Sequence, residues 1–197
     1  MIELVRSDHR RLLRVLTGNS ARWLVFRQDT NAAVSQVREP PGVQFEFLKE
    51  EELRHIENPA DDPEFRNRQI DRLQRFGQSY AYAVKVGGVV AHVSWLLRSS
   101  AILCDPPILL ELREDEAEIT GCETISSFRG KGLYPYALGR IVEAARSCGI
   151  RRVYMKTRDS NESSQRGILK AGFEHAGSIR AITPPLAPSR MFILRNC

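Results

Sequence analysis

The chain has 197 residues, of which 42% are hydrophobic and 27% are charged, and its formal net charge is +5. This length fits one domain with a sizeable core plus an extension, and the composition excludes a disordered chain. The N-terminus lacks the apolar run of a signal peptide, and no apolar stretch is long enough to span a bilayer, so we expect a cytoplasmic protein without a membrane partner.

The cysteines and histidines give no sign of a metal site or a disulfide framework. The four histidines are not spaced as a metal pair, and the four cysteines have neither a paired nor a metal-ligand spacing. We expect no metal, and we expect free thiols in a reducing compartment at Cys104, Cys122, Cys148 and Cys197.

Charge is distributed unevenly along the chain. From Arg129 onward there are 13 Lys and Arg residues against 4 Asp and Glu, whereas residues 1–128 hold 16 basic and 20 acidic residues. A basic C-terminal part suits a polyanionic ligand, and an acidic N-terminal part suits a cationic one. The alternative interpretation is an ordinary scatter of surface charge.

The N-terminal part mixes short helices and strands. We expect a helix over residues 8–17 and a strand from Trp23 to Phe26. Pro40-Pro41-Gly42 breaks the chain. Beyond it, Val43–Leu48 alternates like a strand, and residues 49–55 are typical of one or two helical turns.

A loop at residues 58–63 leads into a predicted helix from Glu64 to Phe76. We expect its apolar residues to face the core, namely Phe65, Leu73 and Phe76. We expect its arginines to form a solvated stripe, namely Arg68, Arg72 and Arg75. Such a stripe also occurs in nucleic-acid-binding proteins, and the solvated surface is the more usual case.

The next segment carries the strongest hairpin signal. Ser79–Val86 and Val89–Leu97 are rich in strand-forming residues and are separated by Gly87-Gly88, which tolerates the positive φ of a tight turn. Residues 104–107 are typical of an irregular link, and residues 108–112 extend that link or form a short strand.

The C-terminal half alternates strands and helices. The expected elements are a strand at 117–125, a helix at 133–148, a strand at 152–156, a helix at 162–170 closed by Gly172, and a final strand near 191–194. This order, together with the hairpin, predicts a mixed sheet of the α/β or α+β class.

The turn between the strand at 117–125 and the helix at 133–148 is the most informative segment. It contains Gly130 and Gly132, so a ligand can approach the backbone closely. The first N–H groups of a helix lack intrahelical partners and lie at its positive end. Such a turn favours phosphate oxygens.

At this turn the chain resembles the GNAT superfamily of acyl-CoA-dependent N-acetyltransferases. The family signature is Gln/Arg-x-x-Gly-x-Gly/Ala at a strand-to-helix turn, followed by Asn and then Gly-Phe. Here the matching segments are Arg129–Tyr134, Asn161 and Gly172-Phe173. The resemblance covers roughly residues 43–195 and implies a GNAT-like α+β fold, a central mixed sheet flanked by helices. We therefore expect residues 43–197 to form the acetyltransferase domain and residues 1–42 an N-terminal extension of unknown role.

The resemblance also implies acetyl-CoA as co-substrate, with no metal. Turn residues would hold its pyrophosphate, namely Arg129, Gly130, Lys131, Gly132, Leu133 and Tyr134. The backbone of Cys122, Glu123 and Thr124 would pair with the pantetheine arm, and Asn161 and Ser164 would make polar contacts with the cofactor. Asn161 also suits a helix N-cap. Two departures stand out: Tyr134 takes the third small position, and Pro135 removes one N–H.

Amine acetylation needs a base for the amine and an acid for the leaving thiolate. Glu118, six residues before Thr124, is the first candidate base, because its position is similar to a strand-borne glutamate of some family members. Glu123 is the second, and alternation would place it on the opposite face of the strand from Glu118. Tyr134 is a candidate acid, with Tyr136, Ser164 and water as alternatives.

Two other family positions carry no such group here. The family's tyrosine acid corresponds to Ile168, and the glutamate base of protein N-terminal acetyltransferases corresponds to Lys156. Cys122, which lacks a paired histidine, is typical of packing rather than of a covalent acyl-enzyme.

The resemblance implies an N-acetyltransferase that moves an acetyl group to a primary amine of a small metabolite by direct attack. Two alternatives stay open: a non-catalytic acyl-CoA-binding module, and a tRNA-dependent aminoacyl or acyl transferase. Nucleic acid is not an expected partner, and a homodimer is compatible with the sequence. The acceptor cannot be read from the first forty residues.

Overall fold

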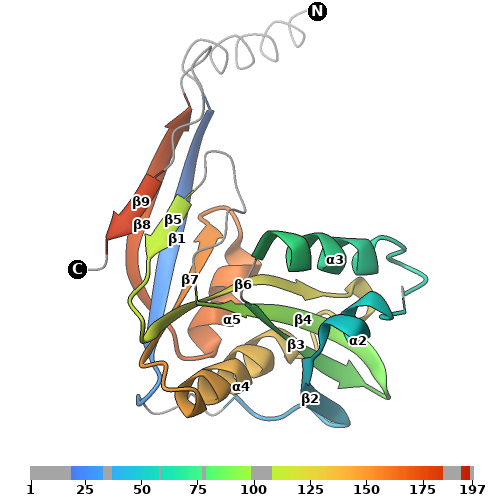
Figure 1. The fold of residues 1–197 in the computed structure, drawn as a ribbon. Helices are drawn as coiled ribbons and strands as arrows, with labels where there is room; N and C mark the ends of the chain where they lie inside the picture. Colours follow the sequence, from blue (N-terminus) through green and yellow to red (C-terminus); the bar gives the residue numbers. More distant parts are fainter. Residues whose placement is uncertain are drawn as a thin grey trace, which may run out of the picture.

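The computed structural model describes residues 19–32, 37–57, 59–76, 79–98, 108–183 and 192–195. Its centre is a seven-stranded sheet in the order β2-β3-β4-β6-β7-β1-β8 (Figure 1). The strands of this sheet are β1 Asn19–Asp29, β2 Val43–Leu48, β3 Ser79–Val86, β4 Val89–Leu97, β6 Glu116–Thr124, β7 Arg152–Arg158 and β8 Glu174–Thr183. A separate parallel pair consists of β5 Ile108–Glu111 and β9 Phe192–Arg195.

The sheet is mixed, because β6 and β7 are parallel whereas the other neighbouring strands are antiparallel. Helices cover both faces: α3 (Phe65–Phe76) lies on one side of β4 and β6, and α4 (Leu133–Ser147) lies on the other (Figure 1). The shorter α2 (Glu50–Arg54) packs with α3, and α5 (Glu162–Lys170) packs with α4. The predicted fold class is therefore confirmed.

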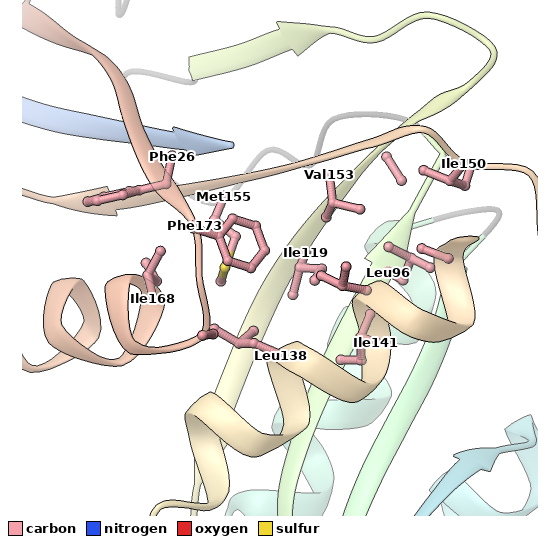
Figure 2. Close-up of a cluster of buried hydrophobic side chains, with 14 residues drawn as sticks. Phe26, Leu96, Ile119, Leu138, Ile141, Ile150, Val153, Met155, Ile168 and Phe173 are labelled. Atoms are coloured by element: carbon pink, nitrogen blue, oxygen red, sulfur yellow. The ribbon is translucent and has the colours of Figure 1, made fainter. Parts of the chain in front are cut away.

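The two largest apolar clusters of the described residues lie on opposite faces of the sheet. On the α4 side, Leu138 and Ile141 of α4 and Ile168 of α5 pack against Ile119 and Met155 of the sheet (Figure 2). On the other side, the cluster comprises apolar residues of α2, α3, the sheet and adjoining loops, namely Leu48, Leu53, Ile56, Phe65, Phe76, Ala81, Ala83, Val93, Trp95, Leu97 and Ile125. The middle strands are thus covered on both faces, as expected for strands with nearly continuous apolar runs.

Local signals predicted several elements well. The hairpin between β3 and β4 turns at Gly87 and Gly88, whose φ angles are 58° and 83°. The predicted helix at 162–170 has the bounds of α5, and the strand predicted at Trp23–Phe26 lies within the longer β1. The helix expected at 8–17 and the link at 104–107 lie outside the described residues.

Two features were not predicted. The polar strand β8 was missed, because its sequence, with His175, Gly177 and Ser178, lacks an apolar alternation. β1 lies between β7 and β8 in the main sheet, pairing antiparallel with both, although it precedes residue 43. None of the helices that the structure describes is long and apolar enough to cross a membrane.

The expectation of a solvated arginine stripe on α3 is wrong for two of its three members. Phe65 and Phe76 are buried as predicted, and Arg75 is exposed and pairs with Asp71. Arg68 and Arg72, however, lie against the sheet and bind Glu123. A carboxylate on the facing strand attracts these guanidinium groups, and periodicity within the helix could not reveal that carboxylate.

Candidate functional site

The parallel strands β6 and β7 separate partway along their length. They pair only from Glu116–Arg152 to Glu118–Tyr154, and both continue beyond the last pair. A cavity of about 680 Å³ opens between the diverging strands. Its wall includes residues 119–124 of β6 and 155–157 of β7, together with the β6–α4 turn and the start of α5.

A β-bulge in β6 determines which of its side chains point to each face of the sheet beside this cavity. Val93 pairs with Glu123 and Trp95 with Thr120, so Ser94 faces both Gly121 and Cys122. Gly121 has φ 58°, and a Cβ there would lie 3.0 Å from the Trp95 ring. Positive φ and close packing both require glycine at this bulge.

The bulge reverses the alternation beyond it. Glu118 and Glu123 therefore both face α3, whereas Ile119 and Cys122 face α4. The expectation that the two glutamates lie on opposite faces of the strand is wrong, because one extra residue shifts the side-chain period of two.

The β6–α4 turn has the backbone that a phosphate site needs. β6 ends at Thr124, a short 3₁₀ turn follows, and α4 begins at Leu133. Gly130 and Gly132 both have φ 77°, and a Cβ at either would meet no atom within 4 Å. Open space beside the first turn of a 15-residue helix fits the diphosphate of coenzyme A.

The loop before α3 braces this turn. The Asp61 carboxylate accepts hydrogen bonds from the Ser126 hydroxyl and from the Ser127 N–H. The Ser126 contact lowers the pKa of Asp61 below its ordinary value. The α2–α3 loop and the glycine turn are thus connected directly, on the side of the sheet that carries α3.

Tyr134 belongs to the first turn of α4 rather than to the glycine turn. The two positive φ angles are at Gly130 and Gly132, so the signature spacing fits best when it begins at Ser127 and ends at Gly132. In this frame both small positions hold glycine, and Ser127 replaces Gln or Arg. Tyr134 then does not interrupt the turn, while Pro135 still supplies no N–H.

The Tyr134 ring crosses from α4 to α5 at the cavity wall. Its hydroxyl lies 3.2 Å from Ser164 Oγ, and its ring covers Gly167 so closely that a Cβ there would lie 2.4 Å from Cδ1 of the ring. Burial raises the pKa of Tyr134 well above its ordinary value, so the phenol keeps its proton at neutral pH. Gly167 is therefore a packing requirement inside a helix.

We expect Gly167→Ala to destabilise the protein by about 1–2 kcal/mol. Helix propensity alone favours alanine by about 1 kcal/mol, but overlap with the rigid, buried Tyr134 ring costs more. Thermal unfolding measures the difference, with Arg166→Ala on the exposed face of α5 as the control. A rise in Tm for Gly167→Ala would contradict this placement of the ring.

The first candidate base, Glu118, is buried and does not line the cavity. Its carboxylate lies 3.1 Å from the Lys156 ammonium, and the two side chains are only 1% and 5% exposed. Lys156 does line the cavity. Lys156, at the position of the glutamate base of protein N-terminal acetyltransferases, thus pairs with Glu118 across the two strands. This contact lies just beyond the last β6–β7 pair.

Glu123, the second candidate base, lines the cavity but binds three groups of α3. Its carboxylate accepts from Arg68 and Arg72, each at 2.6 Å, and from the Gln69 amide at 2.9 Å. Hydrogen bonds to Asp62 and Glu123 raise the pKa of Arg68 above its ordinary value. This carboxylate is held as an ion-pair partner, and the Trp95 indole donates to Gln69 behind it.

The remaining predicted cofactor residues divide into two groups. Arg129, Leu133, Asn161 and Ser164 line the cavity, and the Asn161 side chain also caps α5 by accepting from the Ser164 N–H. Lys131 is not part of the cavity wall, and its ammonium lies over the Phe128 ring at 4.8 Å. Ile168 is fully buried in the core.

Sequence reasoning missed the polar residues of β4 behind the cavity. His92 and Ser94 are fully buried, with the imidazole between the hydroxyls of Thr124 and Ser94. Two polar side chains in an otherwise apolar strand were the available signal. Within the described ranges, no group of three or more His, Cys, Asp or Glu side chains could hold a metal ion.

Comparison with known proteins agrees with this geometry. The model of the acetyltransferase (GNAT) family matches residues 43–173. No curated protein matches the chain by sequence. Among solved structures, a functionally unknown conserved protein from Staphylococcus epidermidis has a TM-score of 0.56 and 11% identity, with 91% of this chain and 66% of that chain covered.

Two further structures share the fold. A putative GNAT acetyltransferase from Novosphingobium aromaticivorans has a TM-score of 0.53 and 18% identity over 82% of this chain and 63% of its own. A GCN5-related N-acetyltransferase from Sphaerobacter thermophilus has a TM-score of 0.56 and 13% identity over 92% and 58%. This chain spans about three-fifths to two-thirds of the length of these proteins. With a family model matched over most of its length and this fold around the glycine turn, the chain belongs to the acetyltransferase (GNAT) family.

Proposed function

We propose that this protein is an N-acetyltransferase that moves an acetyl group from acetyl-CoA to a primary amine of a small molecule. The observation that carries the proposal is the cavity between β6 and β7, which leads from the glycine turn toward the stretch where the two strands pair. The catalytic domain comprises residues 43–197 in this proposal, with β1 completing its sheet.

The order of contacts follows from the order of wall residues. The diphosphate lies at Arg129–Tyr134, and the pantetheine arm pairs with the backbone of residues 122–124. Asn161 and Ser164 contact the cofactor from the start of α5. The acetyl end then reaches residues 119–121, beside Lys156.

The chemistry needs one group that takes a proton and one that gives a proton. The Lys156 ammonium gives one of its protons to the Glu118 carboxylate, and the amine that this leaves on Lys156 takes the proton of the attacking amine. Glu123, bound by the guanidinium groups of Arg68 and Arg72, holds α3 in position beside the cavity. The phenol of Tyr134 stays protonated at neutral pH because its pKa is raised, and it gives this proton to the departing thiolate.

Paired alanine variants test the cofactor site. Gly132 and Gly149 stand at opposite ends of α4, and each has φ 77° with no atom within 4 Å of an added Cβ. Alanine at either position costs a similar backbone strain of about 1–2 kcal/mol. Only Gly132 lines the cavity. We therefore expect Gly132→Ala to weaken CoA binding at least tenfold and Gly149→Ala to leave it unchanged.

Thermal unfolding with millimolar CoA measures this binding, since a ligand at 100 times its Kd stabilises the native state by about 2.7 kcal/mol. Release of free thiol from acetyl-CoA with a panel of amines then measures transfer. CoA binding without thiol release would indicate a non-catalytic acyl-CoA-binding module. Absence of CoA binding by the wild-type protein would refute the proposal.

A further inference from the structure

A group of polar side chains lies behind the α4 wall of the cavity. Thr124 Oγ1 lies 2.7 Å from Nδ1 of His92, and Ser94 Oγ lies 2.7 Å from its Nε2. Ser94 faces Cys122 at the β6 bulge, and the Cys122 thiol donates to the Thr120 carbonyl at 3.7 Å. The Tyr134 hydroxyl contacts Ser164.

The position of this network relates it to the cavity. Its four outer members, Thr124, Cys122, Tyr134 and Ser164, all line the cavity, whereas His92 and Ser94 lie behind them and are fully buried. The His92 ring also lies 5.8 Å from the Tyr134 ring, tilted by 40°. A buried polar pair in the apolar strand β4 therefore contacts the wall residues that would surround the thioester sulfur.

The protonation states of His92 and Cys122 determine which hydrogen bonds these side chains can form. Burial lowers the pKa of His92 to about 3 and raises the pKa of Cys122 to about 11, so both are neutral at pH 7. A neutral imidazole has one N–H. One ring nitrogen therefore donates to one of the two hydroxyls, and the other ring nitrogen accepts from the second hydroxyl. In either tautomer both hydroxyls hold the imidazole in place.

We propose that His92 is a positioning residue for Tyr134: the Thr124 and Ser94 hydroxyls hold the imidazole against the Tyr134 ring, and this contact keeps the phenol where its proton reaches the sulfur of the departing coenzyme A. The inference rests on the proposed transferase function. As the carbon–sulfur bond breaks, its electron pair stays on sulfur and the phenol proton passes to that sulfur. The phenolate left behind regains a proton from solvent, and Glu118 returns to solvent the proton that it received from the attacking amine by way of Lys156.

A double-mutant cycle on kcat distinguishes positioning from a merely structural role. We expect Tyr134→Phe to lower kcat about 100-fold. His92→Phe, which keeps a ring but loses both hydrogen bonds, should lower kcat about tenfold, with the Kd for CoA unchanged within about twofold. The variant with both changes should be no slower than Tyr134→Phe alone, because His92 acts through the phenol.

Three further variants serve as the control, the alternative and the rescue in this test. His175→Phe is the matched control, since this exposed histidine also contacts a ring, that of Phe26, and should leave kcat unchanged. Ser94→Ala breaks the same connection with a smaller change if His92→Phe does not fold, and it should show the same dependence on Tyr134. His92→Gln, whose amide both donates and accepts, should recover part of kcat.

The outcomes separate the two proposals. If the wild-type protein binds CoA and releases thiol but the losses in kcat multiply, His92 supports the fold and the positioning role is refuted. A change in CoA affinity equal to the change in kcat would refute it as well. If the wild-type protein does not release thiol with any amine, the transferase function itself fails, and the role of His92 fails with it.

Discussion

Removing either partner of the Glu118–Lys156 pair should destabilise the protein by about 3–5 kcal/mol, and removing both should restore most of that loss. Both side chains are buried, so a single variant removes one charge of an ion pair in a low-dielectric environment. Urea unfolding at pH 7 of Glu118→Gln, Lys156→Met and the double variant measures the three free energies of unfolding. The exposed pair Arg166–Glu162 is the matched control, where each single change should stay within about 0.5 kcal/mol.

The double variant also tests the chemistry, because it separates folding from proton transfer. If Glu118 takes the amine proton by way of Lys156, the refolded double variant should bind CoA normally while kcat for thiol release falls at least 100-fold. Recovery of kcat together with stability would show that the pair is structural. Equal stability losses in the single and double variants would contradict the strong coupling that a buried pair requires.

Local chemistry explains which parts of the fold could be predicted. The Gly87-Gly88 hairpin and the turn at 130–132 each depend on a few consecutive residues that tolerate positive φ. The helix α4 is likewise predicted by its own sequence, and its residues Leu138, Ile141, Val142 and Ala145 pack on the sheet. For these elements the sequence pattern and the tertiary structure favour the same conformation.

Features that depend on distant partners could not be predicted. β1 joins the sheet through pairs such as Phe26–Met155, more than 120 residues apart in the sequence. Arg68 and Arg72 face the sheet because Glu123 lies opposite them, over 50 residues away. The bulge at Gly121 reversed the expected side-chain alternation, and a single glycine in a strand indicates such a bulge only weakly.

The same limit applies to the candidate site. The glycine turn could be found from spacing, but the burial of Glu118 beneath Lys156 follows from the register of β6 against β7. Lys156, interpreted from sequence as the loss of a family base, pairs with Glu118 and is part of the cavity wall. Lysine at position 156 thus takes the place of a family carboxylate and gives the Glu118 carboxylate a cationic partner.

His92 should make the protein lose stability in acid. Its pKa in the folded protein is about 3 because of burial, against about 6.5 in the unfolded chain. Above pH 6.5 the imidazole is neutral in both states and contributes no pH dependence. Between pH 6.5 and 3 the unfolded chain binds a proton that the native state does not, so the free energy of unfolding falls by about 1.4 kcal/mol per pH unit.

The expected loss at pH 4.5 is about 3 kcal/mol from this residue alone. Cys122 and Tyr134 beside the imidazole have raised pKa values and stay neutral over this range, so they neither oppose nor add to the effect. His92→Phe removes the titrating group. Its deficit at pH 7, about 1–3 kcal/mol for each hydroxyl left without a partner, should shrink as the pH falls.

Urea unfolding of the wild-type protein and of His92→Phe at several pH values between 7 and 4.5 measures this difference. Carboxylates that titrate near pH 4 are present in both proteins and cancel in the comparison. The exposed His175→Phe variant should follow the wild-type curve at every pH. A constant difference between wild type and His92→Phe would mean that the imidazole is protonated as readily in the folded as in the unfolded protein. An imidazole that charges so readily would not stay neutral between Thr124 and Ser94, and the arrangement of one donating and one accepting ring nitrogen would then be lost.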